Sequence, residues 1–141
     1  MYYQQTARVS DDERRLRTAI FMDEQGFKDE FDAIDDDPRT IHVVMYGDDG
    51  TPVACCRCYP SPEEGEWTLG RVAVRSAYRR SGLATALVKE AERRLKTLGA
   101  TAINLGAQTY VTELYAKLGY IVSGPGYADE TVPHTPMRKA L

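Results

Sequence analysis

An α+β domain with a mixed sheet is the fold class that the sequence predicts. Short segments rich in strand-forming residues outnumber the helical segments, and one strongly amphipathic helix falls between the third and fourth of those strands. The length of 141 residues, 43% of them hydrophobic, suits one globular domain over residues 1–141. A chain of this size buries about two-thirds of its unfolded surface, so we expect it to fold without a disulfide or a metal.

The first helix is predicted to begin at Ser10 and to end near Gly26. The Ser10 side chain is expected to accept a hydrogen bond from the N–H of Glu13, while the Glu13 carboxylate reaches back to the backbone of Ser10. Gly26 can close the helix in a left-handed conformation. Three apolar residues then share one helical face: Leu16, Ala19 and Ile20.

The predicted strands are bounded by turn residues. Thr40–Tyr46 and Pro52–Tyr59 form a hairpin around a turn rich in glycine and aspartate, and a third strand covers Trp67–Val74. Further strands are predicted at four segments: Tyr2–Thr6, Ala102–Leu105, Tyr120–Val122 and Thr135–Lys139.

Two further helices are predicted over Gly82–Leu98 and Tyr110–Leu118. Gly99 ends the first of them and Gly119 ends the second. In the longer one, apolar residues recur every three or four positions, which is typical of a helix with one buried face. Two salt bridges across one helical turn are expected on its outer face: Glu90 with Arg94 and Glu92 with Lys96.

Three cysteines, Cys55, Cys56 and Cys58, fall within the second strand of the hairpin. Because side chains alternate between the two faces of a strand, cysteines placed so closely cannot form a disulfide framework. Zinc would need a further pair of ligands, and the two histidines, His42 and His134, are isolated in the sequence. We therefore expect buried thiols and no metal site.

No segment has the pattern of a membrane or export signal. The N-terminus lacks the basic start and the apolar stretch of a signal peptide. The uninterrupted apolar runs are only a few residues long, too short to span a bilayer. The sequence therefore predicts a soluble, cytoplasmic protein with no membrane partner.

The net charge of −3 conceals an uneven distribution. Residues 11–66 hold sixteen acidic and six basic side chains, a balance of −10, whereas residues 71–96 hold eight basic and two acidic ones, a balance of +6. The basic stretch favours an anionic ligand and the acidic stretch a cationic one, although both patterns are also typical of solvated surfaces. With a pI near 5.4, we expect no nucleic-acid partner.

The stretch from Val72 to Ala84 carries the most specific chemical pattern. A buried strand ends, a loop with Arg79 and Arg80 follows, and a helix opens at Gly82, two positions before the small Ala84. The first turn of a helix has free N–H groups and the positive end of the helix dipole. Because Gly82 and Ala84 leave the backbone accessible, the pattern predicts a pyrophosphate site, although the same loop also fits an ordinary helix start.

Two segments resemble motifs of the GNAT superfamily of N-acetyltransferases. The loop sequence RRSGLA at Arg79–Ala84 resembles its R/Q-x-x-G-x-G/A motif, and LYAKLGY at Leu114–Tyr120 resembles its FYxKLGF segment. Together these and the following matches cover nearly the whole chain, from about Arg14 to Lys139. The following residues, in order, resemble a small bacterial YjcF-like branch: Phe21-Met22-Asp23-Glu24-Gln25 for its F-V-x-E-Q segment, Glu30, Asp32, Asp35, His42, Ala107-Gln108, Pro133-His134 and Met137.

The resemblance implies a GNAT-like fold and acetyl-coenzyme A as the cosubstrate. In that fold a mixed, mostly antiparallel central sheet is flanked by helices on both faces. The family's loop binds the pyrophosphate, and the strand before it supplies the N–H donor for the oxyanion of the reaction. The resemblance thus implies these cofactor-binding residues: Val72, Ala73, Val74, Arg79, Arg80, Ser81, Gly82, Leu83, Ala84, Gln108 and Tyr115.

Tyr115 occupies the position that is commonly the general acid of the family. There it would donate a proton to the sulfur of the leaving thiolate. The helical spacing alone also fits a plain core aromatic, since Leu114 and Leu118 share its face.

The attacking amine must be neutral, so a base or a water relay is expected. Several family members carry a glutamate at the strand position where this chain has Gly70. The candidate bases are therefore Glu24, Glu30 and Asp35, within the motif of the branch, and His134, whose side-chain type titrates nearest to neutral pH. Each also has an ordinary interpretation as a solvated carboxylate, or as a histidine that holds a loop.

Six of the nine residues from Asp29 to Asp37 are acidic, which favours a small cationic acceptor: a polyamine, an aminoglycoside-like sugar or a lysine side chain. The leading hypothesis is an acetyl-CoA-dependent N-acetyltransferase, monomeric or homodimeric, whose amine acceptor attacks the thioester directly. A non-catalytic acyl-CoA-binding sensor or partner module is the alternative; Gly70 favours it and Tyr115 opposes it. A nucleotide-phosphate binder is the third hypothesis, although the loop lacks the P-loop and dinucleotide motifs.

Overall fold

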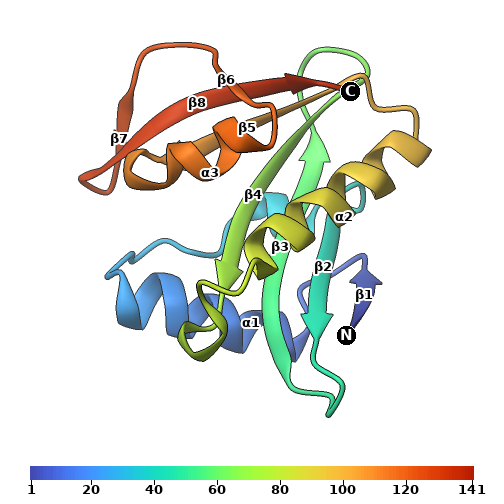
Figure 1. The fold of residues 1–141 in the computed structure, drawn as a ribbon, viewed down its shortest axis with the longest axis vertical. Helices are drawn as coiled ribbons and strands as arrows, with labels where there is room; N and C mark the ends of the chain where they lie inside the picture. Colours follow the sequence, from blue (N-terminus) through green and yellow to red (C-terminus); the bar gives the residue numbers. More distant parts are fainter.

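The computed structural model describes all 141 residues, Met1–Leu141. Its centre is an eight-stranded sheet with the strand order β1-β2-β3-β4-β5-β8-β6, and β7 pairs with β8 beside this path (Figure 1). Every pairing is antiparallel except that of β4 with β5, which confirms the mixed, mostly antiparallel sheet. The strands are β1 (Tyr2–Thr6), β2 (Ile41–Tyr46), β3 (Pro52–Pro60), β4 (Glu66–Val74), β5 (Ala102–Gln108), β6 (Ile121–Val122), β7 (Tyr127–Asp129) and β8 (Val132–Ala140).

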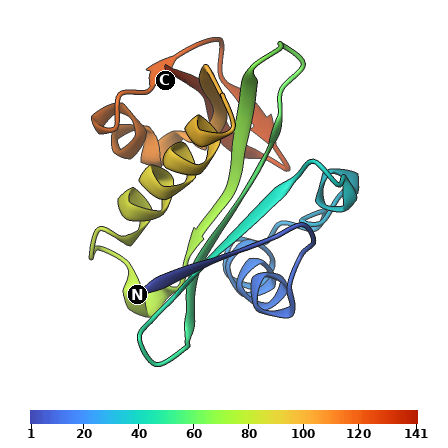
Figure 2. The ribbon, with the colours of Figure 1, turned by 90° about the vertical axis from the view of Figure 1, so that its right-hand side faces the viewer.

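Helices cover both faces of the sheet, as predicted (Figure 2). The helix α1 (Asp11–Arg17) and the π-helix η1 (Thr18–Glu24) lie on one face, and α2 (Leu83–Thr97) and α3 (Thr112–Lys117) lie on the other. Three 3-10 turns complete the chain: η2 (Ala33–Asp36), η3 (Ser76–Tyr78) and η4 (Thr109–Val111). None of the helices combines the length and the apolar character that crossing a membrane requires.

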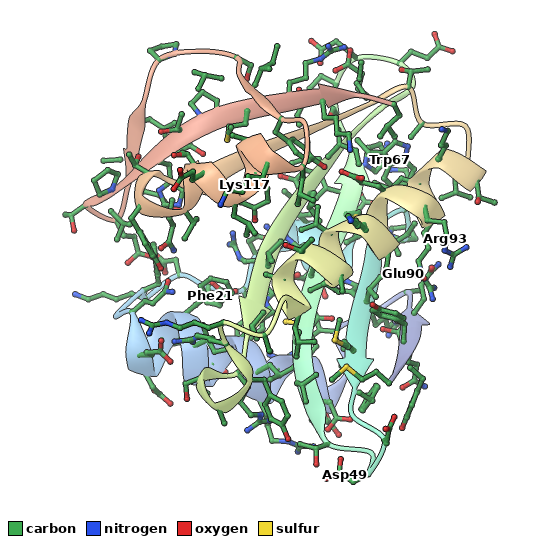
Figure 3. The ribbon with its side chains drawn as sticks, viewed as in Figure 1. Phe21, Asp49, Trp67, Glu90, Arg93 and Lys117 are labelled. Atoms are coloured by element: carbon green, nitrogen blue, oxygen red, sulfur yellow. The ribbon has the colours of Figure 1, made fainter.

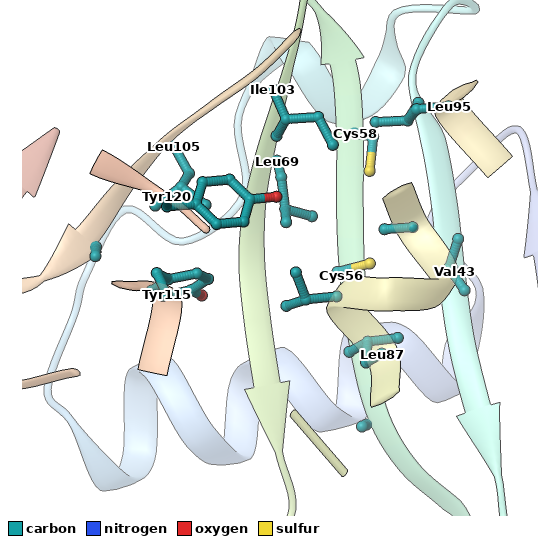
Figure 4. Close-up of a cluster of buried hydrophobic side chains, with 14 of the residues drawn as sticks. Val43, Cys56, Cys58, Leu69, Leu87, Leu95, Ile103, Leu105, Tyr115 and Tyr120 are labelled. Atoms are coloured by element: carbon teal, nitrogen blue, oxygen red, sulfur yellow. The ribbon is translucent and has the colours of Figure 1, made fainter. Parts of the chain in front are cut away.

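The alternation of side chains along the strands separates two hydrophobic cores. Val43 and Cys56 point toward α2, where they join Leu87 in the larger core (Figure 4). The neighbouring Val44 and Cys55 point the other way, into the smaller core on the side of α1 and η1. All three cysteines are buried and free, which confirms the prediction of buried thiols.

The outer face of α2 carries ion pairs, and one of the two predicted pairs is wrong. Glu90 and Arg93 extend from α2 on the side away from β4 (Figure 3), and Glu90 also pairs with Arg94 at 2.7 Å, as predicted. Glu92 pairs with Lys139 of β8 at 3.0 Å and not with Lys96. A partner on a neighbouring strand is thus preferred to one on the same helix.

The start of the first helix agrees with the prediction only in part. The Ser10 hydroxyl accepts from the N–H of Glu13 at 3.1 Å. The Glu13 carboxylate, however, turns into the protein and accepts from Arg17 at 2.8 Å, so the reciprocal half of the capping box is wrong. The helix then widens into the seven residues of η1 and closes at Gly26, whose φ is +82°. A π-helix has no simple sequence pattern, and such stretches are frequent at functional sites.

Two of the C-terminal strands, β5 and β8, extend beyond their predicted bounds, whereas β6 begins one residue later than predicted. β5 continues to Gln108, and all seven of its residues pair with β8, which begins at Val132. The strand β7 lies where the sequence predicts a loop. Pro133 and Pro136 lower the strand propensity of β8, but the pairing of β8 with β5 overrides this local preference.

A wedge opens in the middle of the sheet, between β4 and β5. The two strands pair at only three positions, from Glu66 opposite Ala102 to Thr68 opposite Asn104. Beyond this point β4 stays with β3, and β5 stays with β8. The register between β3 and β4 shifts beside Arg71, whose φ is +52°, so β4 carries a bulge there. The wedge exposes the second half of β4 to the space next to β5.

Candidate active site

The loop between β4 and α2 presents its backbone amides outward. Arg80 and Gly82 have φ of +62° and +79°, which turns successive N–H groups toward one side. Six consecutive amides, from Arg80 to Thr85, donate to no acceptor of the chain. A Cβ placed on Gly82 would meet no atom within 4 Å. The predicted loop therefore has the free donors and the open backbone that bind a diphosphate.

The side chains of the loop support its shape. The Arg79 guanidinium donates to the carbonyl oxygen of Val74 at 2.9 Å, and the Ser81 hydroxyl donates to that of Tyr78 at 2.5 Å. Arg79 also pairs with Glu24, and this hydrogen bonding lowers the pKa of the Glu24 carboxyl. Glu24 thus holds Arg79 at the loop and lies outside the cavity described next, a position that does not favour its predicted role as the base.

A cavity of about 290 Å³ occupies the wedge between β4 and β5. Val72 and Val74 line it, whereas Ala73, between them, packs into the smaller core on the opposite face. Ala84 lines the cavity from the first turn of α2, and Leu83 packs against the larger core. The cavity and the free amides of the loop therefore adjoin at the start of α2.

Tyr115 of α3 lines this cavity. Its side chain is buried, its ring contacts Tyr120 edge-on with centroids 5.7 Å apart, and both lie next to Leu69 of β4 (Figure 4). Its hydroxyl has no hydrogen-bond partner in the chain, and burial raises its pKa well above the usual value for tyrosine. The hydroxyl is therefore protonated at neutral pH and free to donate to a bound molecule.

His134 of β8 lines the same cavity and is 9% exposed. Its Nδ1 lies 2.9 Å from the carbonyl oxygen of Val132. Because a carbonyl only accepts, Nδ1 carries the proton in the neutral ring, and the lone pair is on Nε2. Nε2 has no partner in the chain, while the ring stacks on Tyr127 with centroids 5.4 Å apart. The structure thus holds a proton acceptor at a fixed place in the cavity wall.

The profile of the acetyltransferase (GNAT) family matches residues 6–120. The chain belongs to the GNAT family. YjcF, an uncharacterized N-acetyltransferase of Bacillus subtilis, is 28% identical over 140 residues, which cover 93% of this chain and 96% of YjcF. A candidate acetyltransferase of the same organism is 32% identical over 126 residues, 88% of this chain and 84% of that protein. An acyl-CoA N-acyltransferase from Pseudomonas aeruginosa has the same fold, with a TM-score of 0.86 and 29% identity over 99% of this chain and 100% of that chain.

These matches confirm the predicted resemblance and the GNAT fold. The matched family is one of acetyltransferases, and the Pseudomonas neighbour uses acyl-CoA for N-acyl transfer. Acyl-CoA-dependent N-acyl transfer is therefore the class of activity to which this GNAT chain belongs.

The segment that resembles the F-V-x-E-Q motif makes three different contacts in this GNAT structure. Phe21 is buried and lines the cavity. Glu24 pairs with Arg79 of the loop. The side-chain oxygen of Gln25 accepts from the amide of Gln108, at the end of β5, at 2.8 Å. Because η1 places these residues around the wedge, the motif joins the helical layer to the donor loop and to β5.

Most of the acidic run from Asp29 to Asp37 is neutralised inside this GNAT domain. Glu30 pairs with Arg17 at 2.8 Å and with Arg71 at 2.9 Å. Asp35 pairs with Arg17 and Arg57, Asp32 with Arg57, and Asp37 with Arg39. The expectation that six carboxylates attract the acceptor is therefore too simple, because arginines already hold four of them.

Two of the predicted bases lie in this buried network. Asp35 does not line the cavity; burial would raise the pKa of its carboxyl, but hydrogen bonds from Arg17 and from the N–H of Asp32 hold it well below the usual range. Glu30 lines the cavity, and burial raises the pKa of its carboxyl against the lowering effect of Arg71. Its oxygen Oε2 nevertheless accepts from two guanidinium groups, which leaves it less free than His134 Nε2 to take a proton.

The carboxylates of Glu13 and Asp35 and the ring of His42 lie within 4.8 Å of one another, the spacing of metal ligands. Arg17 Nη1, however, donates to both carboxylates, at 2.8 and 2.7 Å. The guanidinium thus supplies the positive charge at the place where a metal ion would bind.

Among the residues of the cavity wall that sequence reasoning missed are Tyr127 and Asp129. Both belong to β7, in a region rich in glycine and proline that resembles a loop. The Tyr127 hydroxyl lies against Gly106 of β5, where a Cβ would come within 1.9 Å of it. Gly106 inside a strand was the available signal, since glycine there marks the close approach of another group.

Proposed function

We propose that the protein transfers an acetyl group from acetyl-CoA to a primary amine of a small, cationic acceptor, by direct attack of the amine on the thioester. In this proposal the loop Arg79–Ala84 binds the pyrophosphate, and the backbone of Val72–Val74 faces the carbonyl oxygen. Tyr115 is the general acid and His134 is the general base.

One observation carries the proposal. Six unpartnered amides at the start of α2 adjoin a cavity in which Tyr115 and His134 each present a polar atom that has no partner in the chain. The loop residues Arg80–Gly82 are exposed, and Tyr115 and His134 line the cavity, so all of these polar groups are accessible to a bound molecule. An acyl-CoA and an amine would together bond to the donors of the loop, to the Tyr115 hydroxyl and to His134 Nε2.

The proton steps follow from these positions. His134 Nε2 takes a proton from the amine as the new C–N bond forms. N–H groups of the bulged strand β4 stabilise the oxyanion. When the C–S bond breaks, Tyr115 gives its proton to the sulfur, so that the products are a neutral amide and a thiol. Solvent returns one proton to Tyr115 and removes one from His134.

The surroundings of Tyr115 support a short acyl group. Leu69 and Leu105 are both buried and both line the cavity, and they bound the space next to the hydroxyl with branched side chains. An acyl chain longer than acetyl would have to displace the acceptor from a cavity of about 290 Å³. The three buried free thiols fit a reducing compartment such as the cytoplasm, where we place the reaction.

Release of free thiol from acetyl-CoA in the presence of a panel of amines tests the proposed activity. We expect turnover that depends on an amine and falls with butyryl-CoA as donor. Binding of coenzyme A by calorimetry with no turnover of any amine would contradict transfer and support the sensor. Equal affinity for ATP and coenzyme A would support the nucleotide-phosphate binder instead.

The substitution Gly82→Trp tests the donor loop. An indole at this position covers amides that are now free, so we expect the KM for acetyl-CoA to rise by about tenfold or more, the loss of one charge-assisted hydrogen bond. The matched control is Gly99→Trp at the other end of α2, where φ is also positive and the space is also open. The control carries the same backbone strain, so an equal rise of KM in both variants would refute the assignment.

A further inference from the structure

The outer wall of the cavity is a hairpin turn that is tied to a distant loop. The turn between β7 and β8 has Glu130 and Thr131 at its centre, with φ of +46° and +76°. The Glu130 carboxylate accepts from the N–H of Lys28 at 2.9 Å and from the N–H of Asp29 at 3.0 Å. This tie holds the backbone of Asp29, which follows η1, at the turn that begins directly after Asp129 of β7.

Asp29 and Asp129 differ from the other carboxylates of the cavity region. Both line the cavity, both are exposed at its mouth, and neither carboxylate has a hydrogen bond or an ion pair in the chain. Glu30 beside them is held by two arginines. The cavity therefore carries two carboxylates without an ion pair, which favour a positively charged group in the ligand.

The inner part of the same cavity points to a ligand independently of these charges. His134, nine-tenths buried, presents an Nε2 atom with no partner in the chain. The aromatic rings of Tyr127, Tyr59 and Phe27 also line the cavity, and those of Tyr127 and Phe27 lie against His134. Burial and the charge of Asp129 raise the pKa of Tyr127, which agrees with a carboxylate close to that ring. One cavity thus brings together a proton acceptor, aromatic rings and two carboxylates.

We propose that the acceptor is a linear aliphatic diamine, whose protonated second amine lies between Asp29 and Asp129 while its neutral first amine lies at His134. This inference rests on the proposed function and names the substrate class of the same site. The alkylene chain packs on the aromatic wall, and the ammonium group receives the two charge-assisted hydrogen bonds that the mouth offers.

The same geometry disfavours the other cationic acceptors. A free amino acid would bring its carboxylate to two aspartates and be repelled. A lysine in a folded protein or an aminoglycoside-like sugar is a wider group than an alkyl chain, and the Glu130 tie and the stacking of Tyr127 on His134 restrain the hairpin that lines the cavity. A narrow chain with a charge at its far end satisfies both constraints.

The test compares linear α,ω-diamines with n-alkylamines of the same carbon number as acceptors for acetyl-CoA. We expect kcat/KM for the best diamine to exceed that of its matched alkylamine by about tenfold or more, the value of a hydrogen bond to a charged group. In Asp29→Asn and in Asp129→Asn this ratio should fall toward one. Asp36→Asn, at an exposed carboxylate of the same acidic run outside the cavity, should keep the wild-type ratio.

Calorimetric binding of the diamine to the protein loaded with coenzyme A separates this inference from the proposed function. Tight diamine binding that weakens in Asp29→Asn, without acetylation of any amine, would overturn the transferase and keep the diamine site. Turnover of alkylamines as fast as that of diamines, or a diamine preference that survives both aspartate variants, would overturn the diamine site and keep the transferase.

Discussion

Replacing Tyr115 by Phe is expected to lower kcat by about 10²-fold or more, the usual contribution of a positioned general acid. The substitution removes one hydroxyl that has no partner in the chain, so the fold loses no hydrogen bond. Without it, the sulfur leaves as an anion into a largely apolar space. Since the donor is held by the loop and not by this hydroxyl, the KM for acetyl-CoA should change little. Single-turnover kinetics with a saturating amine measure the effect on the chemical step.

Tyr120→Phe is the matched control for this prediction. Its ring contacts that of Tyr115, but its hydroxyl is turned away and donates to Glu92 at 2.8 Å. Loss of this hydrogen bond should cost about 1 kcal/mol of stability and leave the chemical step unaffected. A kcat that changes equally in both variants, or in neither, would remove Tyr115 from the mechanism.

The elements that the sequence predicts best are those with a local cause. The stripe of apolar residues in α2 and the alternating cysteines of β3 each depend on the periodicity of one element. The loop at Gly82 depends on the free amides that every helix start provides. The π-helix η1, the strand β7 and the full length of β5 depend on partners that are distant in the sequence, so no local pattern reveals them.

The candidate site also has a part that local sequence predicts and a part that depends on residues distant in the chain. The donor loop is one continuous segment, and the structure gives it the predicted free backbone. The acceptor side is assembled from η1, β4, β5, β7 and β8, and residue types alone cannot say which carboxylate pairs with which arginine. Glu24 and Asp29 look alike in the sequence, yet Glu24 pairs with Arg79 while the carboxylate of Asp29 stays free. The backbone at Asp29 is in turn held by Glu130, 101 residues away in the chain.

A buried ionic network connects the fold to this site. Arg17, with a fully buried side chain, donates to Glu13, Glu30 and Asp35 at 2.7 to 2.8 Å. Burial acts to lower the pKa of Arg17, but these hydrogen bonds raise it above its usual value. Glu30 in turn accepts from Arg71, at the bulge of β4. Arg17 of α1 thus holds in place Glu30, which lines the cavity.

Arg17→Met is expected to lower the free energy of unfolding by about 3–5 kcal/mol, because it leaves three buried carboxylates short of positive charge. For a chain of this length the midpoint of thermal unfolding should fall by about 10 °C or more. Arg15→Met is the matched control on the same helix. Its side chain is 70% exposed and pairs only with Asp12, so its loss should cost at most about 1 kcal/mol. Equal stability of the two variants would show that the carboxylates are satisfied without Arg17, and that the network does not hold the acceptor side in place.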